Sequence, residues 1–130
     1  MNTEESLATR LEATVALTTL VASRIYPVEL PEQATMPAVT YRRIDTPTAH
    51  MLSEARSSWE YPRFQVTSWG ATYASAKAVN AEVQTALDGF AGTMGGVGGK
   101  VCWVTLISSY DLPDPVTGRK RVMSDFEIWG

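Results

Sequence analysis

Three prolines constrain the early part of this chain more than any other feature. Pro27, Pro31 and Pro37 lie in the stretch "RIYPVELPEQATMPAVTYRRI", residues 24 to 44, which contains no glycine. Each proline fixes φ near about −65°, removes a backbone donor and pushes the preceding residue toward extended geometry. A helix before Pro27 must therefore end there, and the chain is expected to continue as a stiff, extended strap that leads from a helix to a sheet.

Helical periodicity precedes this strap and returns once later in the chain. Leu7, Leu11 and Val15 recur near a period of about 3.6 residues, which predicts a helix over residues 4 to 22. The stretch "TYASAKAVNAEVQTALDG" predicts a second helix, with Thr72 as its N-cap and the glycine that ends the stretch as its C-cap. Its many alanines suit a helix that lies flat on a sheet.

Four segments have the composition and alternation of β-strands. They are "PAVTYRRID" (37 to 45), "WEYPRFQVTSWG" (59 to 70), "KVCWVTLISSY" (100 to 110) and "RKRVMSDFEIWG" (119 to 130). The third is apolar on both faces, which predicts a central strand. The turn-rich "DLPDPVTG" between the last two predicts that they pair as a hairpin.

The order α-β-β-α-β-β predicts an α+β fold, in which two helices pack on a mostly antiparallel four-stranded sheet. The length of 130 residues favours a single domain over residues 1–130. Residues 46–58 have no clean period and many small polar residues, so we expect a long loop or an extended hairpin arm there. A segment of this length in a compact domain is usually functional or mobile.

Composition and charge exclude several classes of function. The net charge is −3, and basic residues cluster only at Arg42, Arg43 and residues 119–121, which disfavours a nucleic-acid-binding protein. Such clusters at strand ends are typical of solvated or edge-protecting positions. No apolar run approaches the roughly 18 residues needed to span a bilayer, and the acidic N-terminus lacks the pattern of a signal peptide. We therefore expect a soluble protein made in a cytoplasm.

Residues that could carry catalysis lack the partners that catalysis requires. Cys102 is the sole cysteine and lies inside a strand-like segment, where it is expected to be a small buried hydrophobe. His50 is the sole histidine, so one chain cannot build a multi-histidine metal site, and an exposed or interface position is favoured. Asp125 and Glu127 share one face of a strand, and we interpret them as the wet side of the sheet rather than a cation site.

The glycine-rich stretch "GTMGGVGGKV", residues 92 to 101, is not a phosphate-binding loop. That motif would need glycine at Met94 and a hydroxyl residue at Val101. The stretch also precedes a strand, whereas the mechanism needs a helix whose N-terminus meets the phosphates. Neither a nucleophile elbow nor a dinucleotide fingerprint is present, so no cofactor and no enzymatic activity are expected.

The chain as a whole resembles the tail-completion family of long-tailed bacteriophages, also described as tail terminator or tail-to-head joining proteins. The matching features are "LVASRIYP" (20 to 27), "MPAVTYRRI" (36 to 44), "RFQVTSWGATYASAKAVNAEVQTAL" (63 to 87) and the final "DFEIW". They occur in the family's order and cover nearly the whole chain.

The resemblance implies a structural virion protein that forms a ring, typically a hexamer, at the head-proximal end of the tail tube. The ring stops tube polymerisation and meets the connector of the filled head, and DNA passes through its lumen without specific binding. The implied partners are further copies of the chain, the tail tube protein and a connector or neck protein, with no cofactor and no membrane. A ring repeats one heterologous contact, so each protomer needs two complementary faces.

Candidate interface residues come from the basic clusters, the 46–58 segment and the turn near 111–120. They are Arg42, Arg43, His50, Met51, Asp111, Asp114, Arg119, Lys120 and Arg121. The strap over residues 24–37 is a further candidate, because a proline-stiffened segment loses little entropy on docking.

Two other readings of the sequence remain open. A head-tail connector or neck adaptor protein has a similar size and α/β content, but it would attach to the connector before tails arrive. A small ligand-binding or hydrolytic domain would need a pocket around Asp125, Glu127 or His50. Alanine at those three positions would then abolish ligand binding or turnover and leave assembly intact.

Overall fold

The computed structural model describes residues 2–45, 48–50, 56–60, 62–96, 98–112 and 119–129, with the backbone alone for 48–50, 56–60 and 100. Its helices are α1 (Thr3–Ala13), α2 (Val15–Val21) and α3 (Tyr73–Leu87). Its strands are β1 (Ile25–Pro27), β2 (Ala38–Asp45), β3 (Thr48–His50), β4 (Arg56–Glu60), β5 (Arg63–Gly70), β6 (Ala91–Met94), β7 (Lys100–Asp111) and β8 (Lys120–Trp129). Within these ranges, no helix is long and apolar enough to cross a membrane.

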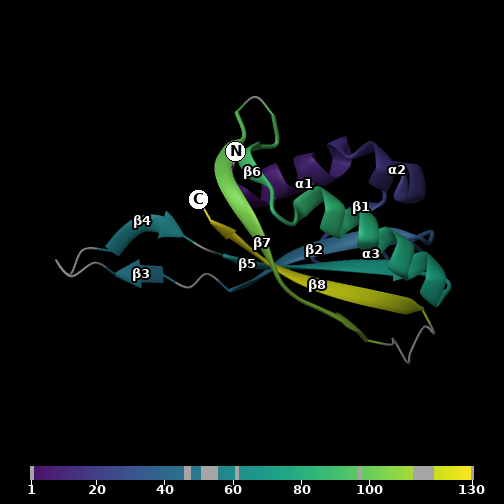
Figure 1. The fold of residues 1–130 in the computed structure, drawn as a ribbon. Helices are drawn as coiled ribbons and strands as arrows, with labels where there is room; N and C mark the ends of the chain where they lie inside the picture. The colour runs from purple at the N-terminus through teal and green to yellow at the C-terminus, as the bar shows by residue number, and fades with distance from the viewer. Residues whose placement is uncertain are drawn as a thin grey trace.

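Six strands form one mixed, curled sheet in the order β1-β2-β5-β8-β7-β6. The β1–β2 pair is parallel, and every other neighbouring pair in this sheet is antiparallel. The helices lie over one face of the sheet, so the opposite face has no helical cover (Figure 1). β3 and β4 pair with each other and project beyond the end of the sheet where β2 ends and β5 begins (Figure 1).

The predicted fold, with two helices and four antiparallel strands in the order α-β-β-α-β-β, is wrong. The four expected strands correspond to β2, β5, β7 and β8, but β1 and β6 extend the sheet at its two edges. β1 has three residues and β6 has four, which is too short for an alternating pattern to be detected. Hydrogen bonds to the longer neighbours β2 and β7 make these segments strands.

The predicted single helix over residues 4–22 is two helices, because the chain breaks at Thr14. Thr14 has an extended ψ of 102°, and its hydroxyl donates to the carbonyl oxygen of Arg10 at 2.8 Å. The same kind of bond occurs at Thr9 and Thr85 inside unbroken helices, so this bond alone does not cause the break. The break lets Leu11 and Leu17 both face the core, whereas Val15, predicted on the same apolar stripe, is 76% exposed.

β7 is not the central strand that its two apolar faces predicted. It is the second strand from the edge, and β6 covers its outer side only from Lys100 to Trp103. The apolar residues on its second face, including Trp103 and Ile107, are exposed to solvent instead of buried under a second layer. The apolar residues on both faces of β7 therefore indicate an exposed apolar surface and not a central position in the sheet.

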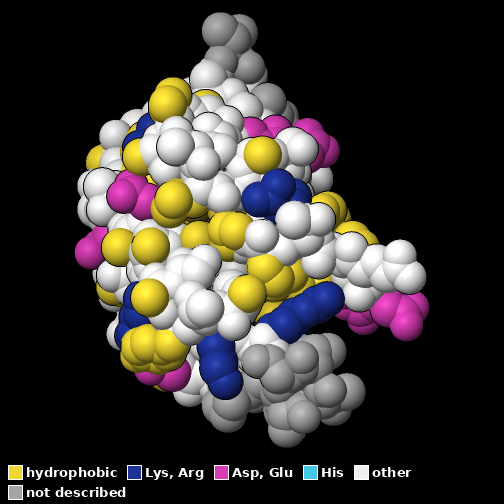
Figure 2. All heavy atoms as spheres, turned by 90° about the vertical axis from the view of Figure 1, so that its right-hand side faces the viewer, with side chains coloured by type: hydrophobic (Ala, Val, Ile, Leu, Met, Phe, Trp, Pro, Cys, Tyr) yellow, Lys and Arg dark blue, Asp and Glu magenta, His cyan; other side chains and the backbone are white. Residues whose placement is uncertain are grey.

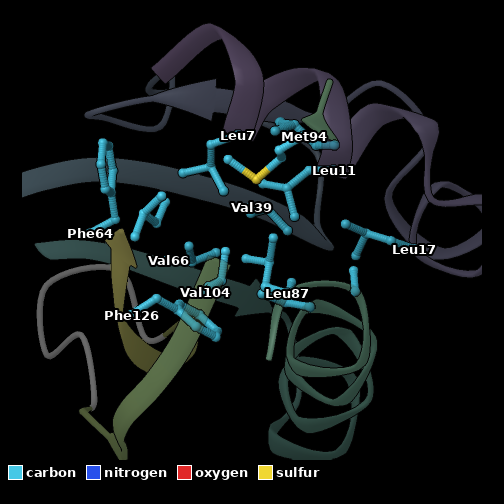
Figure 3. Close-up of a cluster of buried hydrophobic side chains, with 14 of the residues drawn as sticks. Leu7, Leu11, Leu17, Val39, Phe64, Val66, Leu87, Met94, Val104 and Phe126 are labelled. Atoms are coloured by element: carbon cyan, nitrogen blue, oxygen red, sulfur yellow. The ribbon is translucent and has the colours of Figure 1, made fainter. Parts of the chain in front are cut away.

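The hydrophobic core fills the space between the sheet and the helices (Figure 3). Phe64 of β5 and Phe126 of β8 are paired in register and lie toward one side of this cluster (Figure 3). Side chains from α1, α3 and the strand β6 complete the core, with Leu7, Leu11, Leu87 and Met94 fully buried. Cys102 is buried, as predicted.

Local signals set the ends of α3. The hydroxyl of Thr72, the predicted N-cap, accepts a hydrogen bond from the backbone N–H of Ser75 at 3.2 Å. Gly89, the predicted C-cap, has a φ of +75°, a conformation that glycine adopts without strain. Gly70 ends β5, and a Cβ there would lie 2.7 Å from the backbone nitrogen of Ala76. Glycine is thus required where the strand passes directly into the helix.

The strap is a closed loop, because its two ends meet beside β1 and β2. The Nε of Arg24 donates to the carbonyl oxygen of Pro37 at 2.8 Å, and the N–H of Val39 donates to the carbonyl oxygen of Arg24 at 2.9 Å. The chain turns at Val28, whose φ is +63° and whose N–H donates to the carbonyl oxygen of Tyr41 at 2.8 Å. This turn brings the loop against the open face of the sheet.

Candidate functional site

Polar side chains are buried on the sheet face that the helices leave open. Thr40 of β2, Gln65 of β5 and Thr67 of β5 are only 5%, 6% and 5% exposed. They line a cavity of about 250 Å³, here called the cradle, under the turn at Val28. The lining includes Thr40, Arg42, Gln65, Thr67, Trp69 and Arg121, which come from β2, β5 and β8.

Hydrogen bonds fix the side chains of the cradle. The Nε of Arg42 donates to Gln65 Oε1 at 3.0 Å, and Gln65 Nε2 lies 2.7 Å from the hydroxyl oxygen of Tyr110. The indole Nε1 of Trp69 donates to the hydroxyl oxygen of Thr40 at 3.0 Å. Buried polar groups with such partners hold a defined geometry. The cradle is therefore a preorganised surface and not a loosely packed gap.

Two arginines give the cradle its charge. The guanidinium of Arg121 lies over the ring of Trp69, 5.3 Å from its centroid, and its Nε donates to the carbonyl oxygen of Leu112 at 3.0 Å. Arg42 and Arg121 have no carboxylate partner among the residues that the structure describes, although Glu29 also lines the cavity. Their terminal N–H groups suit a carboxylate or another planar anion.

Adjacent arginines of β2 point to opposite faces, because side chains alternate along a strand. Arg42 lies in the cradle, whereas Arg43 lies on the helical side. The Nε of Arg43 is 2.7 Å from Glu4 Oε1 of α1, and its guanidinium lies 5.2 Å from the ring centroid of Phe64. The two residues form one basic cluster in the sequence, their side chains lie on opposite faces of β2, and both also line a neighbouring cavity of about 370 Å³.

The second predicted basic cluster lies around the cradle. Arg121 is inside it, and Arg119 donates to the backbone oxygen of Glu32 in the strap at 3.3 Å. Lys120 lines a neighbouring cavity of about 290 Å³ with Asp111. Seen from the end of the sheet where β5 ends and β8 begins, Lys and Arg side chains lie among hydrophobic ones (Figure 2). Arg42 is thus brought to the same surface as a cluster almost 80 positions later in the chain.

Three candidate residues fall wholly or partly outside the described residues. Met51 and Asp114 lie outside the described ranges, and for His50 the structure describes only the backbone, as the last residue of β3. The residues of the cradle that sequence reasoning missed are Thr40, Gln65, Thr67, Trp69 and Tyr110. The alternation of Gln65, Thr67 and Trp69 along β5 was a usable signal, since it places three hydrogen-bonding side chains on one face.

The interpretation of Asp125 as a solvated residue is wrong. Asp125 is 4% exposed, and its Oδ2 lies 3.2 Å from a terminal nitrogen of Arg63 and 3.4 Å from the hydroxyl of Ser108. These two partners come from β5 and β7, the strands on either side of β8, and alternation along a single strand cannot reveal them. Among the described residues, no group of three His, Cys, Asp or Glu side chains could hold a metal ion.

The carboxyl group of Asp111 is expected to have a pKa below the ordinary value for aspartate. The Tyr73 hydroxyl, which donates to Asp111 Oδ2 at 2.6 Å, and the Lys77 ammonium, 3.1 Å from Oδ1, hold the pKa of Asp111 below its ordinary value. Because the folded-state pKa is lowered, the stabilisation is present above the ordinary pKa and is lost as pH falls through the lowered one. The pKa is measured by NMR, from the chemical shift of the Asp111 carboxyl carbon as a function of pH.

Tyr73→Phe and Lys77→Met should each raise the pKa of Asp111, since the first removes the hydrogen bond from the tyrosine and the second removes both a hydrogen bond and a positive charge. Unchanged amide spectra elsewhere would serve as the control for folding. An ordinary Asp111 pKa in the unsubstituted protein would contradict the assigned hydrogen bonds.

Comparison with known proteins identifies the family of the chain and a solved structure with a similar fold. The model of a family described as "Tail completion protein gp17" matches residues 5–130. A chain in the structure entitled "Virion of native gene transfer agent (GTA) particle" is similar with a TM-score of 0.74 and 18% identity, over 95% of this chain and 90% of that chain. No curated protein matches the sequence. At 18% identity, the structural match shows that the two chains share a fold.

Proposed function

Because residues 5–130 match its model, the chain belongs to the tail completion protein gp17 family, and we propose that it forms a ring that ends the tail tube and joins it to the head connector. The chain is accordingly a structural protein of a bacteriophage tail, and it acts in the virion. The proposed ring is a hexamer without catalytic activity, and its partners are the tail tube protein and a connector or neck protein.

The observation that carries the proposal is the extent of the family match, which runs from α1 to the last residue of the chain. The likeness to the chain from the gene transfer agent virion, over 95% of this chain, supports it at the level of fold. A ring of identical protomers repeats one heterologous contact, which needs two different surfaces on each protomer. The net charge of −3 suits a lumen through which DNA slides without sticking.

The cradle is assigned, within this proposal, to contact with the tube or connector protein. Its two arginines lack a described carboxylate partner, and hydrogen bonds to Gln65 and to the carbonyl oxygen of Leu112 keep them in place before a partner arrives. Preorganised side chains lose little entropy on docking. The expected occupant is an acidic segment of the neighbouring virion protein, held through carboxylate–guanidinium pairs.

A nonsense codon in this reading frame is expected to produce tails of uncontrolled length beside DNA-filled, tailless heads. Without a ring at the tube end, nothing stops polymerisation and nothing offers a surface to the connector. Electron microscopy of the lysate measures both products directly. Expression of the intact chain from a plasmid should restore normal particles and serves as the control.

Two other outcomes have different meanings. Heads that have lost their DNA, beside tails of normal length, would place the protein on the connector side of the joint. Intact and infectious particles would contradict a required role in tail completion.

A further inference from the structure

Along the first half of β7, other segments of the same chain form hydrogen bonds with the backbone groups on its outer edge. β6 pairs with it from Lys100 to Trp103. Val104 then exchanges both of its backbone hydrogen bonds with the segment after α3, at 3.0 Å and 2.9 Å. The N–H of Leu106 donates to the side chain of Asp88 at 3.1 Å. Up to Leu106, therefore, this edge offers few free backbone groups.

Beyond Leu106 the same edge has no backbone partner among the described residues. A register shift falls between Leu106 and Ser108, after which Ser108 and Tyr110 lie opposite Asp125 and Met123 of β8. The N–H of Leu112 donates to β8, so in the alternating ladder the backbone groups of Ser109 and Asp111 point away from it. β7 runs along the outside of the sheet here (Figure 1).

This open edge, residues 107–111, lacks the lysine and proline that often protect edge strands, and its protection is limited to the register shift at its start and the charge of Asp111. Its sequence is Ile-Ser-Ser-Tyr-Asp, without lysine or proline. Ile107 and Tyr110 are each 40% exposed. An unpaired edge strand is a template for another strand, and proteins normally block such edges unless they use them.

The arm made of β3 and β4 also lacks a neighbouring strand. Its two strands pair only with each other among the described residues, and they project away from the six-stranded sheet (Figure 1). A two-stranded hairpin is marginal in water by itself. β4 has five residues, which matches the five residues of the open edge. The arm therefore gains most from pairing with a further strand.

We propose that the arm of one protomer adds to the open edge of β7 in the next protomer. The inference rests on the proposed ring, and it names the repeated contact. The arm and the open edge are different surfaces of one chain, so a contact between them is heterologous. Each protomer would use its arm on one neighbour and its open edge on the other, and the same contact would repeat until the ring closes. The other edge strand, β1, has only three residues and ends in Pro27, which makes it a poor acceptor.

Cross-linking tests the contact directly. Ser58→Cys in β4 and Ile107→Cys in the open edge are combined in a Cys102→Ala background, and a short bismaleimide is applied to particles and to concentrated purified protein. A ladder of covalent oligomers in either sample, ending at one closed species, is the expected result. Cross-links only within single chains, dimers that grow no further, or no cross-link in both samples would overturn the proposal.

Edge-blocking substitutions give a second test with a matched control. Ile107→Lys places a charge on the open edge, whereas Val101→Lys makes the same kind of change where β6 already covers the same strand. Val101 is 70% exposed, so lysine is accommodated there as well. Ile107→Lys should lower particle yield at least tenfold with an unchanged melting temperature, and Val101→Lys should leave the yield near normal. Equal yields from both variants would overturn the proposal.

These results separate the inference from the proposed function. A nonsense codon that gives long tails and tailless heads, together with an absent ladder, would leave the tail-completion role intact and remove only the arm–edge contact. A ladder from purified protein, together with normal tails after the nonsense codon, would keep the contact and remove the role.

Discussion

Particles that carry Arg42→Glu or Arg121→Glu are expected to form at least about tenfold less efficiently than unsubstituted ones. Both guanidinium groups lie in the cradle, and each is held by a neighbouring side chain or backbone oxygen on the open face of the sheet. Reversing one member of a desolvated charge pair costs about 2–5 kcal/mol of binding free energy, and each 1.4 kcal/mol is about tenfold in affinity. The titre of infectious particles measures the effect.

Arg43→Glu is the matched control for this experiment. It makes the same change at the next residue, but on the helical side of the sheet, where Arg43 is paired with Glu4. That pair is partly exposed, so its loss should cost less than about 1 kcal/mol of folding free energy. Circular dichroism should show that all three variants fold. An equal loss of titre from Arg43→Glu and Arg42→Glu would remove the cradle as the partner contact.

Phe126→Ala is expected to destabilise the protein by about 3–5 kcal/mol, the range for truncating a buried phenylalanine. Phe126 is fully buried, is paired in register with Phe64, and lies in the core between sheet and helices (Figure 3). The truncation removes apolar contacts and leaves a cavity in the middle of the sheet. In thermal unfolding, the midpoint should fall by roughly 10 °C or more.

Val15→Ala provides the comparison, because Val15 is exposed at the start of α2. Its effect should remain within about 0.5 kcal/mol, as for surface substitutions in general. A similar loss from both variants would contradict the placement of Phe126 in the core.

Local chemistry made part of the structure predictable from the sequence. Thr72 caps α3 because a threonine hydroxyl satisfies a free backbone N–H at a helix start, and Gly89 follows that helix because glycine adopts positive φ. Asn2 caps α1 through the N–H of Glu5 in the same way. β7 and β8 pair across the turn-rich segment, as expected. Each of these features depends on residues within a few positions of one another.

Features that depend on distant partners were not predictable in this way. β1 and β6 are strands only because β2 and β7 offer them hydrogen bonds, and Asp125 is buried beside Arg63 and Ser108 of the two neighbouring strands. The break at Thr14 follows from the way two helical segments fit the same core. Pattern rules treat each segment alone, so they gave a straight helix, a four-stranded sheet and a solvated aspartate.

The same distinction between local and long-range features applies to the candidate site. The order of short motifs along the chain was enough to indicate the family, and the family model matches nearly the whole chain. Alternation along β2 also determines that Arg42 and Arg43 face opposite sides. Only the tertiary structure decided that Arg42 and Arg121 share one cavity, because strand order and sheet curl set distances between residues far apart in sequence. Side-chain direction is a local property of the backbone, whereas convergence on one surface is a property of the whole fold.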